Sequence, residues 1–218
     1  MVPDTIRSMT VHTSQLLAGA QALGVPLTPE AAARLQRLLD ELLRWNKAYN
    51  LTAITDPGEM LTHHLLDSLA IAPHLHGATV ADVGTGAGFP GLPLALVRPD
   101  LRFTLVDSNG KKLRFVGHAA RTLGLANLQT LHGRVEDLKP AAPFGTVVAR
   151  AFAPLPQLLA LVAPLCGPDT RVLAMKGRNV DAELAGLPPG WQLQQNLSLT
   201  VPGLDEARHL VVACRLPA

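Results

Sequence analysis

A glycine-dense run at residues 81–91 constrains the fold of this chain more than any other segment. Its sequence, ADVGTGAGFPG, leads from an apolar, strand-like stretch into a turn that contains Gly84, Gly86 and Gly88. Glycine has no Cβ atom, so it allows positive φ angles and lets the backbone approach a bulky ligand closely. The run therefore predicts a strand, a loop that binds an adenosine-type cofactor, and a helix.

Acidic residues near the ends of three predicted strands indicate which cofactor this is. Asp107 ends the second strand, where a carboxylate can accept both ribose hydroxyls, and Glu136 follows the third, where it can face the adenine amino group. Asp82 disfavours a pyrophosphate but can hold a cationic amino-acid group. S-adenosylmethionine carries this group. The three acids therefore favour a methyltransferase over the dehydrogenase that the G-x-G-x-x-G pattern at 86–91 also allows.

Length and composition indicate a globular protein that needs no disulfides. A chain of 218 residues can bury a large core, and its two cysteines, Cys166 and Cys214, lie in apolar stretches without metal or redox spacing. The sequence has no signal-peptide pattern and no apolar stretch as long as a membrane span. We therefore expect a cytoplasmic protein with no membrane association.

Basic residues gather around the proposed cofactor loops, although the formal net charge is only +2. Such a cluster is either an ordinary solvated surface or a face that follows the phosphates of a nucleic acid. The residues are Arg98, Arg102, Lys111, Lys112, Arg114, Arg121, Arg134, Lys139, Arg150, Arg171, Lys176 and Arg178.

The first part of the chain is predicted to be helical. Thr28 followed by proline marks a helix start, and leucines recur at three- and four-residue intervals over 31–49. Asp56 begins a further helix that carries His63 and His64. Residues 1–12 show no periodic signal. We expect a helical extension over residues 1–77 and a methyltransferase domain over residues 78–218.

Short apolar runs alternate with helical segments after residue 78, which predicts a mostly parallel sheet. The last two runs are separated by too few residues for a helix, so we expect them to form an antiparallel hairpin. The seven predicted strands are 79–83, 102–107, 128–132, 146–149, 171–176, 192–200 and 209–215.

Five blocks in this order resemble the small-subunit ribosomal RNA guanine-N7 methyltransferases, the RsmG or glucose-inhibited division protein B family. The resemblance extends from about residue 30 to the end of the chain. The WNKAYNLT and HLLDSL blocks are more specific to this family than the glycine loop. The blocks are WNKAYNLT at 45–52, HLLDSL at 64–69, DVGTGAGFPG at 82–91, LVDS at 105–108 and RAFAPL at 150–155, and they are joined by MKG at 175–177.

The resemblance implies a class I, Rossmann-like fold that uses S-adenosylmethionine and releases S-adenosylhomocysteine. It implies that the substrate is 16S ribosomal RNA or the small ribosomal subunit. We expect the protein to be a monomer, a point that the sequence leaves open. His63 stands where the family commonly has arginine or lysine, so an RNA contact there would depend on pH. The residues expected to contact the cofactor by this resemblance are Gly84, Phe89, Val135, Glu136 and Arg150, with Asp107 on the ribose.

Guanine N7 offers a lone pair, so methylation there needs positioning rather than a general base. Groups that hold the guanine edge, stack on the ring or fix nearby phosphates are therefore the useful ones. We expect Arg150 and Lys176 to act in catalysis, and His64, Phe152, Lys176 and Arg178 to bind the substrate.

Other chemistries lack their signatures in this sequence. The loop after the fourth predicted strand has no Asn/Asp-Pro-Pro-aromatic motif for amino methylation, and neither cysteine is placed for carbon-5 chemistry. The histidines of 63–76 match no standard metal spacing, so we predict no metal; His64 and Asp67 should instead form hydrogen bonds on a helix face that closes over the cofactor.

Some alternatives remain open at this stage. Trp45 either docks the helical extension onto the sheet, which we favour, or stacks on a base. The whole chain could also be a methyltransferase for a protein or small molecule, or a non-catalytic nucleotide-binding regulatory protein.

Overall fold

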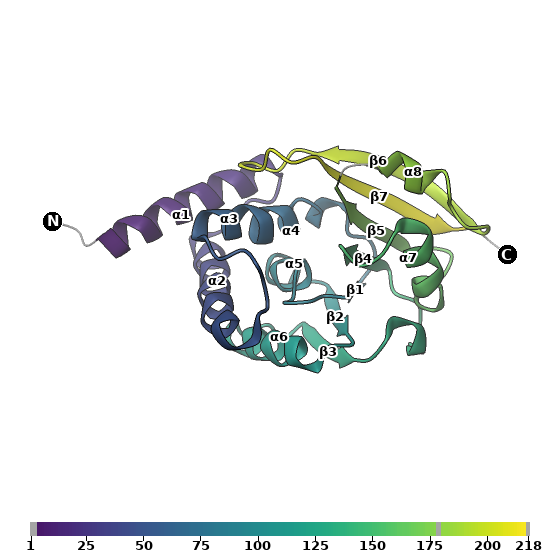
Figure 1. Ribbon diagram of the computed structural model, residues 1–218, viewed down its shortest axis with the longest axis horizontal. Helices are drawn as coiled ribbons and strands as arrows, with labels where there is room; N and C mark the ends of the chain where they lie inside the picture. Colours follow the sequence, from purple (N-terminus) through teal and green to yellow (C-terminus); the bar gives the residue numbers. More distant parts are fainter. Residues whose placement is uncertain (1–3, 178–179, 217–218) are drawn as a thin grey trace.

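A seven-stranded sheet forms the centre of the protein (Figure 1). The computed structural model describes residues 4–177 and 180–216, and the strand order is β3-β2-β1-β4-β5-β7-β6. Strands β1 to β5 are parallel, and β7 pairs antiparallel with both β5 and β6. The predicted fold class is confirmed. The strands are β1 Thr79–Val83, β2 Arg102–Asp107, β3 Leu128–His132, β4 Thr146–Arg150, β5 Arg171–Lys176, β6 Trp191–Leu199 and β7 Arg208–Arg215.

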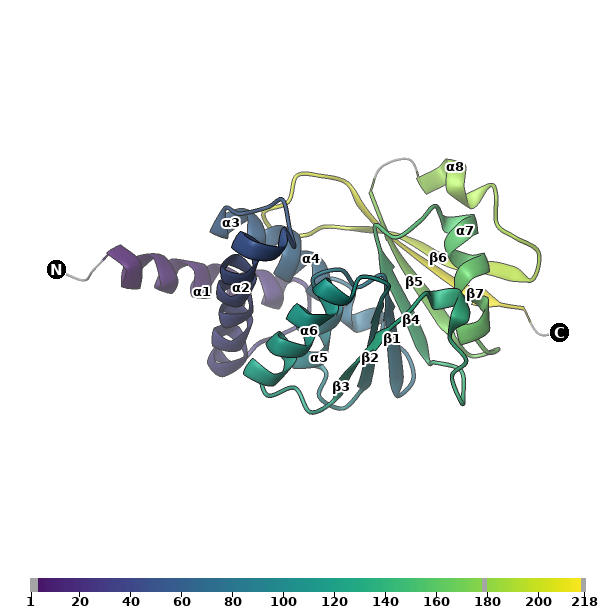
Figure 2. The same ribbon diagram turned by 60° about the horizontal axis from the view of Figure 1, so that its bottom comes forward.

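Helices cover both faces of the sheet and form two hydrophobic clusters with it (Figure 2). One face packs against α5 (Gly91–Val97), α6 (Gly110–Thr122) and the N-terminal helices. The other face packs against α7 (Leu155–Val162) and the short α8 (Val180–Leu184). Strands buried on both faces need nearly continuous apolar sequence, which is why the positions of the central strands β1, β2, β4 and β5 could be predicted closely.

The N-terminal helices follow the predicted capping signals. Helix α1 spans Asp4–Ala22 and begins earlier than the sequence pattern indicates. Helix α2 spans Pro29–Tyr49, and the Thr28 side chain accepts a hydrogen bond from the Ala31 backbone N–H at its start. These helices share a hydrophobic cluster with α5 and α6. The boundary between residues 77 and 78 stays a prediction.

The helix after Asp56 contains a widened turn that the sequence did not predict. A short α3 (Pro57–Met60) continues into the π-helix η1 (Leu61–Leu66), then into α4 (Asp67–Leu69) and the 3₁₀ turn η2 (Ala72–His74). The expected cap is present, because Asp56 Oδ1 accepts from Glu59 N at 2.9 Å. π-Helical turns are rare and often lie at functional sites.

The chain reverses its direction across the sheet between β1 and β4. It moves outward from β1 to β2 and β3, and then returns to β4 on the other side of β1. Ligands of open α/β sheets bind at such a switch point, beyond the carboxyl ends of the strands. Two further 3₁₀ turns, η3 (Val135–Asp137) and η4 (Ala163–Leu165), complete the described elements. No helix among the described residues has the length and apolar character needed to span a bilayer.

Trp45 docks helix α2 onto helix α6, as favoured from the sequence. Its ring centroid lies 5.8 Å from that of Phe115 and 4.9 Å from that of His118. Tyr49 stacks on Trp45 at 5.2 Å but is 39% exposed.

We predict that Trp45→Ala lowers the free energy of unfolding by about 2–4 kcal/mol, because it leaves a cavity between two helices. The matched variant Tyr49→Ala should lower it by less than about 1 kcal/mol, since that side chain is partly exposed and its loss leaves no enclosed cavity. Urea unfolding monitored by circular dichroism measures both values. Equal losses for the two variants would contradict the docking role of Trp45.

Candidate active site

Two cavities open along the carboxyl ends of the central strands. The first, of about 380 Å³, lies beyond β1, β2 and β3, and the second, of about 410 Å³, lies between η1 and the ends of β4 and β5. The first cavity is lined by residues that include Gly84, Asp107, Val135, Glu136 and Phe152. The second cavity is lined by residues that include His63, His64, Asp67, Arg150, Lys176 and Arg208.

Ala151 is the residue that both cavities share. Its φ angle is +49°, which is uncommon for a residue other than glycine. Left-handed residues of this kind cluster at functional sites, where the surrounding structure holds them in place. The shared wall joins the two cavities, so ligands in both would meet at this point.

The glycines of the loop after β1 serve different purposes. A Cβ atom on Gly84 would lie 2.2 Å from the Phe152 ring, so this glycine makes room for a side chain of the protein itself. A Cβ atom on Gly86 would meet only the Gly84 carbonyl oxygen, at 4.0 Å. Of these two, only Gly86 leaves open space for a ligand to approach the backbone.

Asp82 is buried beneath this loop and fastens it. Its Oδ2 atom accepts hydrogen bonds from Thr85 Oγ1 at 2.6 Å and from Gly91 N at 2.9 Å. Its Oδ1 atom is also buried and has no hydrogen-bond partner among the described residues. Burial raises the pKa of Asp82 to about 6. One oxygen thus holds the loop, and the other is buried beneath it and lines neither cavity, so the expected contact of Asp82 with a cationic amino group stays a prediction.

Asp107 joins the same loop to the end of β2. Its Oδ2 atom accepts from Gly86 N at 2.8 Å, and its Oδ1 atom accepts from Asn109 N at 2.7 Å. Each carboxylate oxygen keeps a second lone pair, so both can still accept from ribose hydroxyls. The residues of the first cavity therefore fit the adenosine half of S-adenosylmethionine.

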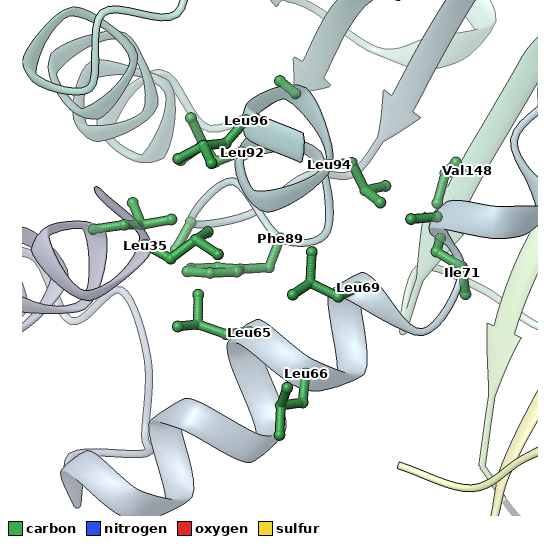
Figure 3. Close-up of a cluster of buried hydrophobic side chains, with 14 of the residues drawn as sticks. Leu35, Leu65, Leu66, Leu69, Ile71, Phe89, Leu92, Leu94, Leu96 and Val148 are labelled. Carbon is green, nitrogen blue, oxygen red and sulfur yellow. The ribbon is translucent and has the colours of Figure 1, made fainter. Parts of the chain in front are cut away.

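Other predicted cofactor residues differ in how they could make contact. Val135 is buried, whereas Glu136 is exposed and faces Arg134, with its Oε1 atom 3.7 Å from the Arg134 Nη1 atom. Phe89 does not line either cavity, because its ring is buried among leucines of the core (Figure 3). A cofactor contact at Phe89 would have to come from its backbone.

A buried carboxylate and two arginines form one wall of the second cavity. Asp67 is only 3% exposed, and its two oxygens accept from different arginines. Arg150 Nη1 lies 3.1 Å from Asp67 Oδ2, and Arg208 Nε lies 3.2 Å from Asp67 Oδ1. Arg150 also donates to the His63 carbonyl oxygen at 2.7 Å. Both guanidinium groups are thereby fixed at the cavity.

His64 is a neutral group in this wall. Burial, followed by the positive charge of Arg150, lowers the pKa of His64 to about 4. Its Nε2 atom shares a hydrogen bond with Thr52 Oγ1 at 3.0 Å, and its ring stacks on Phe89 with centroids 4.8 Å apart. His64 and Asp67 therefore have separate partners, although we expected hydrogen bonds on one helix face.

Three predicted substrate residues lie in different surroundings. Lys176 lines the second cavity, but its ammonium group already donates to Glu183 Oε2 and to the Ala153 carbonyl oxygen, both at 2.7 Å. Phe152 lines the first cavity, against Gly84, and does not line the second cavity with Lys176, although we expected both residues to bind the substrate. Arg178 lies outside the described residues.

Sequence reasoning missed Arg208. It belongs to the last strand, 141 positions from Asp67, and no local motif marks it. The available signal was weak: Asp67 lies among leucines on its helical segment, and a carboxylate buried there requires a cationic partner.

A cysteine nucleophile is excluded by the surroundings of Cys166. Its thiol is buried in the second hydrophobic cluster and donates to the Val162 carbonyl oxygen at 3.2 Å. Burial raises the pKa of the Cys166 thiol to about 12, so it stays protonated and unreactive.

Comparisons with known proteins agree with this geometry. The sequence model of one protein family, rRNA small subunit methyltransferase G, matches residues 31–211. The chain is 47% identical to ribosomal RNA small subunit methyltransferase G of Pseudomonas paraeruginosa over 94% of its length and 96% of the relative's. It is 50% identical to the protein of that name from Alkalilimnicola ehrlichii, over 90% and 89% of the two chains.

Solved structures of methyltransferases share the fold. TrmN from Thermus thermophilus has a TM-score of 0.54 and 23% identity, over 72% of this chain and 53% of that one. The O-methyltransferase TomG from Streptomyces achromogenes, in complex with SAM, has a TM-score of 0.55 and 16% identity, over 83% and 90%. The family match and the close relatives together show that the chain belongs to the ribosomal RNA small subunit methyltransferase G family.

Proposed function

We propose that the protein transfers the methyl group of S-adenosylmethionine to N7 of one guanine in 16S ribosomal RNA. As a member of its family, it is an S-adenosylmethionine-dependent ribosomal RNA methyltransferase. The observation that carries the proposal is the pair of cavities joined at Ala151, one lined by acids and the other by arginines. In this proposal the first cavity holds the cofactor and the second holds the guanine.

The second cavity supplies positioning groups rather than a base. When bound, S-adenosylmethionine supplies an electrophilic methyl group next to a positively charged sulfur. Holding the base in line with that group contributes up to about 7–11 kcal/mol. Arginine and lysine donors pair with the O6 atom of guanine. Arg150, together with Lys176 in the lining of the same cavity, is therefore suited to orient the ring. The neutral His64 adds no charge beside a base that becomes cationic.

The wider biological setting belongs to the same proposal. The partner is 16S ribosomal RNA or the small ribosomal subunit that contains it, and the enzyme works as a cytoplasmic monomer without membrane contact. Its basic strand ends support an RNA acceptor over a protein or small molecule.

Methyl transfer to small ribosomal subunits tests the proposal directly. Labelled S-adenosylmethionine should label subunits that lack their native N7-methylguanine, and the label should map to a single guanine N7 in 16S RNA. Native, already methylated subunits are the control and should take up no label. Incorporation at an amino group, or none despite cofactor binding, would overturn the proposal.

Asp107→Asn should weaken the binding of S-adenosylmethionine at least tenfold. The amide loses acceptor capacity for the ribose, and a hydrogen bond to a charged group contributes about 1.5–3 kcal/mol. Isothermal titration calorimetry measures the affinity. Asp137→Asn is the matched control, because that carboxylate is exposed and does not line the first cavity. An unchanged affinity in Asp107→Asn would remove the ribose assignment.

The pKa of His64 predicts a pH-dependent stability. In the folded state its pKa is about 4, below the ordinary value of 6.5, so the unfolded chain binds the proton more readily. The contribution of His64 to stability is complete above pH 6.5 and is lost as the pH falls towards 4. Between pH 7 and pH 4.5 the parent should therefore lose about 2–3 kcal/mol more than His64→Gln.

Urea unfolding at several pH values measures this difference. The raised pKa of Asp82 acts in the opposite direction, but it is present in both proteins and cancels in the comparison. His76→Gln controls for the loss of a histidine as such, since that residue lies before β1, at the amino-terminal ends of the central strands and away from His64. Parallel profiles for the parent and His64→Gln would refute the prediction.

A further inference from the structure

A basic groove lies between helix α6 and the edge strand β3, outside the two cavities described above. Its lining comes from one face of α6 and one face of β3, which pack side by side (Figure 2). We call it the α6–β3 groove. Its lining includes Arg114, Gly117, Arg121, Thr130 and His132, and Lys111 lines a hollow that adjoins the groove at the start of α6.

The cations of this groove have no acidic partner. Arg114 and Arg121 are exposed, as is Lys111 in the adjoining hollow, and none of them forms an ion pair with a described residue. No carboxylate of the described chain lines the groove. The arginines of the second cavity differ, because Arg150 and Arg208 are both paired with Asp67. The positive charge of the groove is therefore not neutralised by a carboxylate of the described residues.

The spacing of these residues suits a phosphate backbone. Arg114 and Arg121 are seven positions apart, which places them on the same helix face about 10 Å from each other. Two cations on one face at this separation can contact two phosphates of the same nucleic-acid strand.

Gly117 keeps the floor of the groove open between the two arginines. A Cβ atom there would meet only Arg121 Nη1, at 3.5 Å, so internal packing does not demand a glycine. Glycine inside a helix costs about 1 kcal/mol relative to alanine. A glycine that internal packing does not require, on the floor of a basic groove, is consistent with the close approach of a ligand.

The groove is continuous with the proposed active site. The hollow at the start of α6 shares Gly110 and Arg114 with the groove, and shares Ser108 with the first cavity. The first cavity in turn shares Ala151 with the second. A row of depressions therefore leads from the second cavity, past the first cavity, to the unpaired cations of the groove.

We propose that the α6–β3 groove binds the phosphodiester backbone of the RNA substrate at a distance from the methylated base. This inference rests on the proposed function, because it assigns a second contact surface to the same substrate. Phosphate contacts of this kind fix the register of an RNA without reading its sequence. The groove would therefore contribute to affinity for RNA and not to methyl transfer itself.

The test compares two double variants with the same change in charge. Arg114→Gln/Arg121→Gln removes the groove cations, and Arg37→Gln/Lys47→Gln removes two exposed cations of α2, which line neither the groove nor the two cavities. Binding of 16S ribosomal RNA is measured by filter retention from 50 to 200 mM salt. Methyl transfer to small subunits, affinity for S-adenosylmethionine and thermal unfolding are measured in parallel.

The groove variant should bind RNA at least tenfold more weakly at low salt, and its salt slope should fall by about 1.5. KM for subunits should rise while kcat and cofactor affinity stay near the parent's. The α2 variant should match the parent in every measurement. Arg114→Lys/Arg121→Lys should restore binding to within about twofold, because it restores the charge.

Two negative results have different meanings. If the groove variant matches the α2 variant in affinity and salt slope while the parent methylates subunits, the groove inference is wrong and the proposed function stands. If the parent neither binds nor methylates ribosomal RNA, the proposed function itself fails.

Discussion

The buried carboxylate of Asp67 holds together parts of the chain that the sequence keeps far apart. It joins the helical segment around η1 to the end of β4 through Arg150 and to the start of β7 through Arg208. Removing one partner of a buried pair leaves a charge without compensation, at a cost of about 3–5 kcal/mol. This three-way contact holds one wall of the second cavity together. The orientation of both arginines, and the position of His64 three residues earlier, depend on it.

The described site separates charge along the edge of the sheet. Asp107 and Glu136 line the cavity where a cationic cofactor is expected, with Asp82 buried beneath the nearby loop, whereas Arg150 and Arg208 line the cavity proposed for an anionic RNA. A formal net charge of +2 conceals this separation, because opposite charges cancel in the sum. The separation places each proposed ligand beside charges of the opposite sign, although the chain as a whole is not strongly basic.

The fold could be predicted from sequence because its signals are local. Buried parallel strands require apolar runs, and Thr28 and Asp56 cap their helices through backbone groups three residues away. The family could be identified because its blocks are contiguous in sequence. The roles of Arg208 and Phe152 could not be predicted, since each depends on a partner in another part of the chain.

The π-helical turn of η1 sets the direction in which the side chains after it point around the helix axis. A π-turn holds one residue more than an α-turn, and each residue of an α-helix advances the chain by about 100°. If the same residues of Leu61–Leu66 were wound as a plain α-helix, everything after them would turn by about 100° around the helix axis. Asp67 would then point away from its two arginines, and the apolar residues after it would lose their places in the core. The extra residue of the π-turn therefore sets which side of the helix faces the arginines.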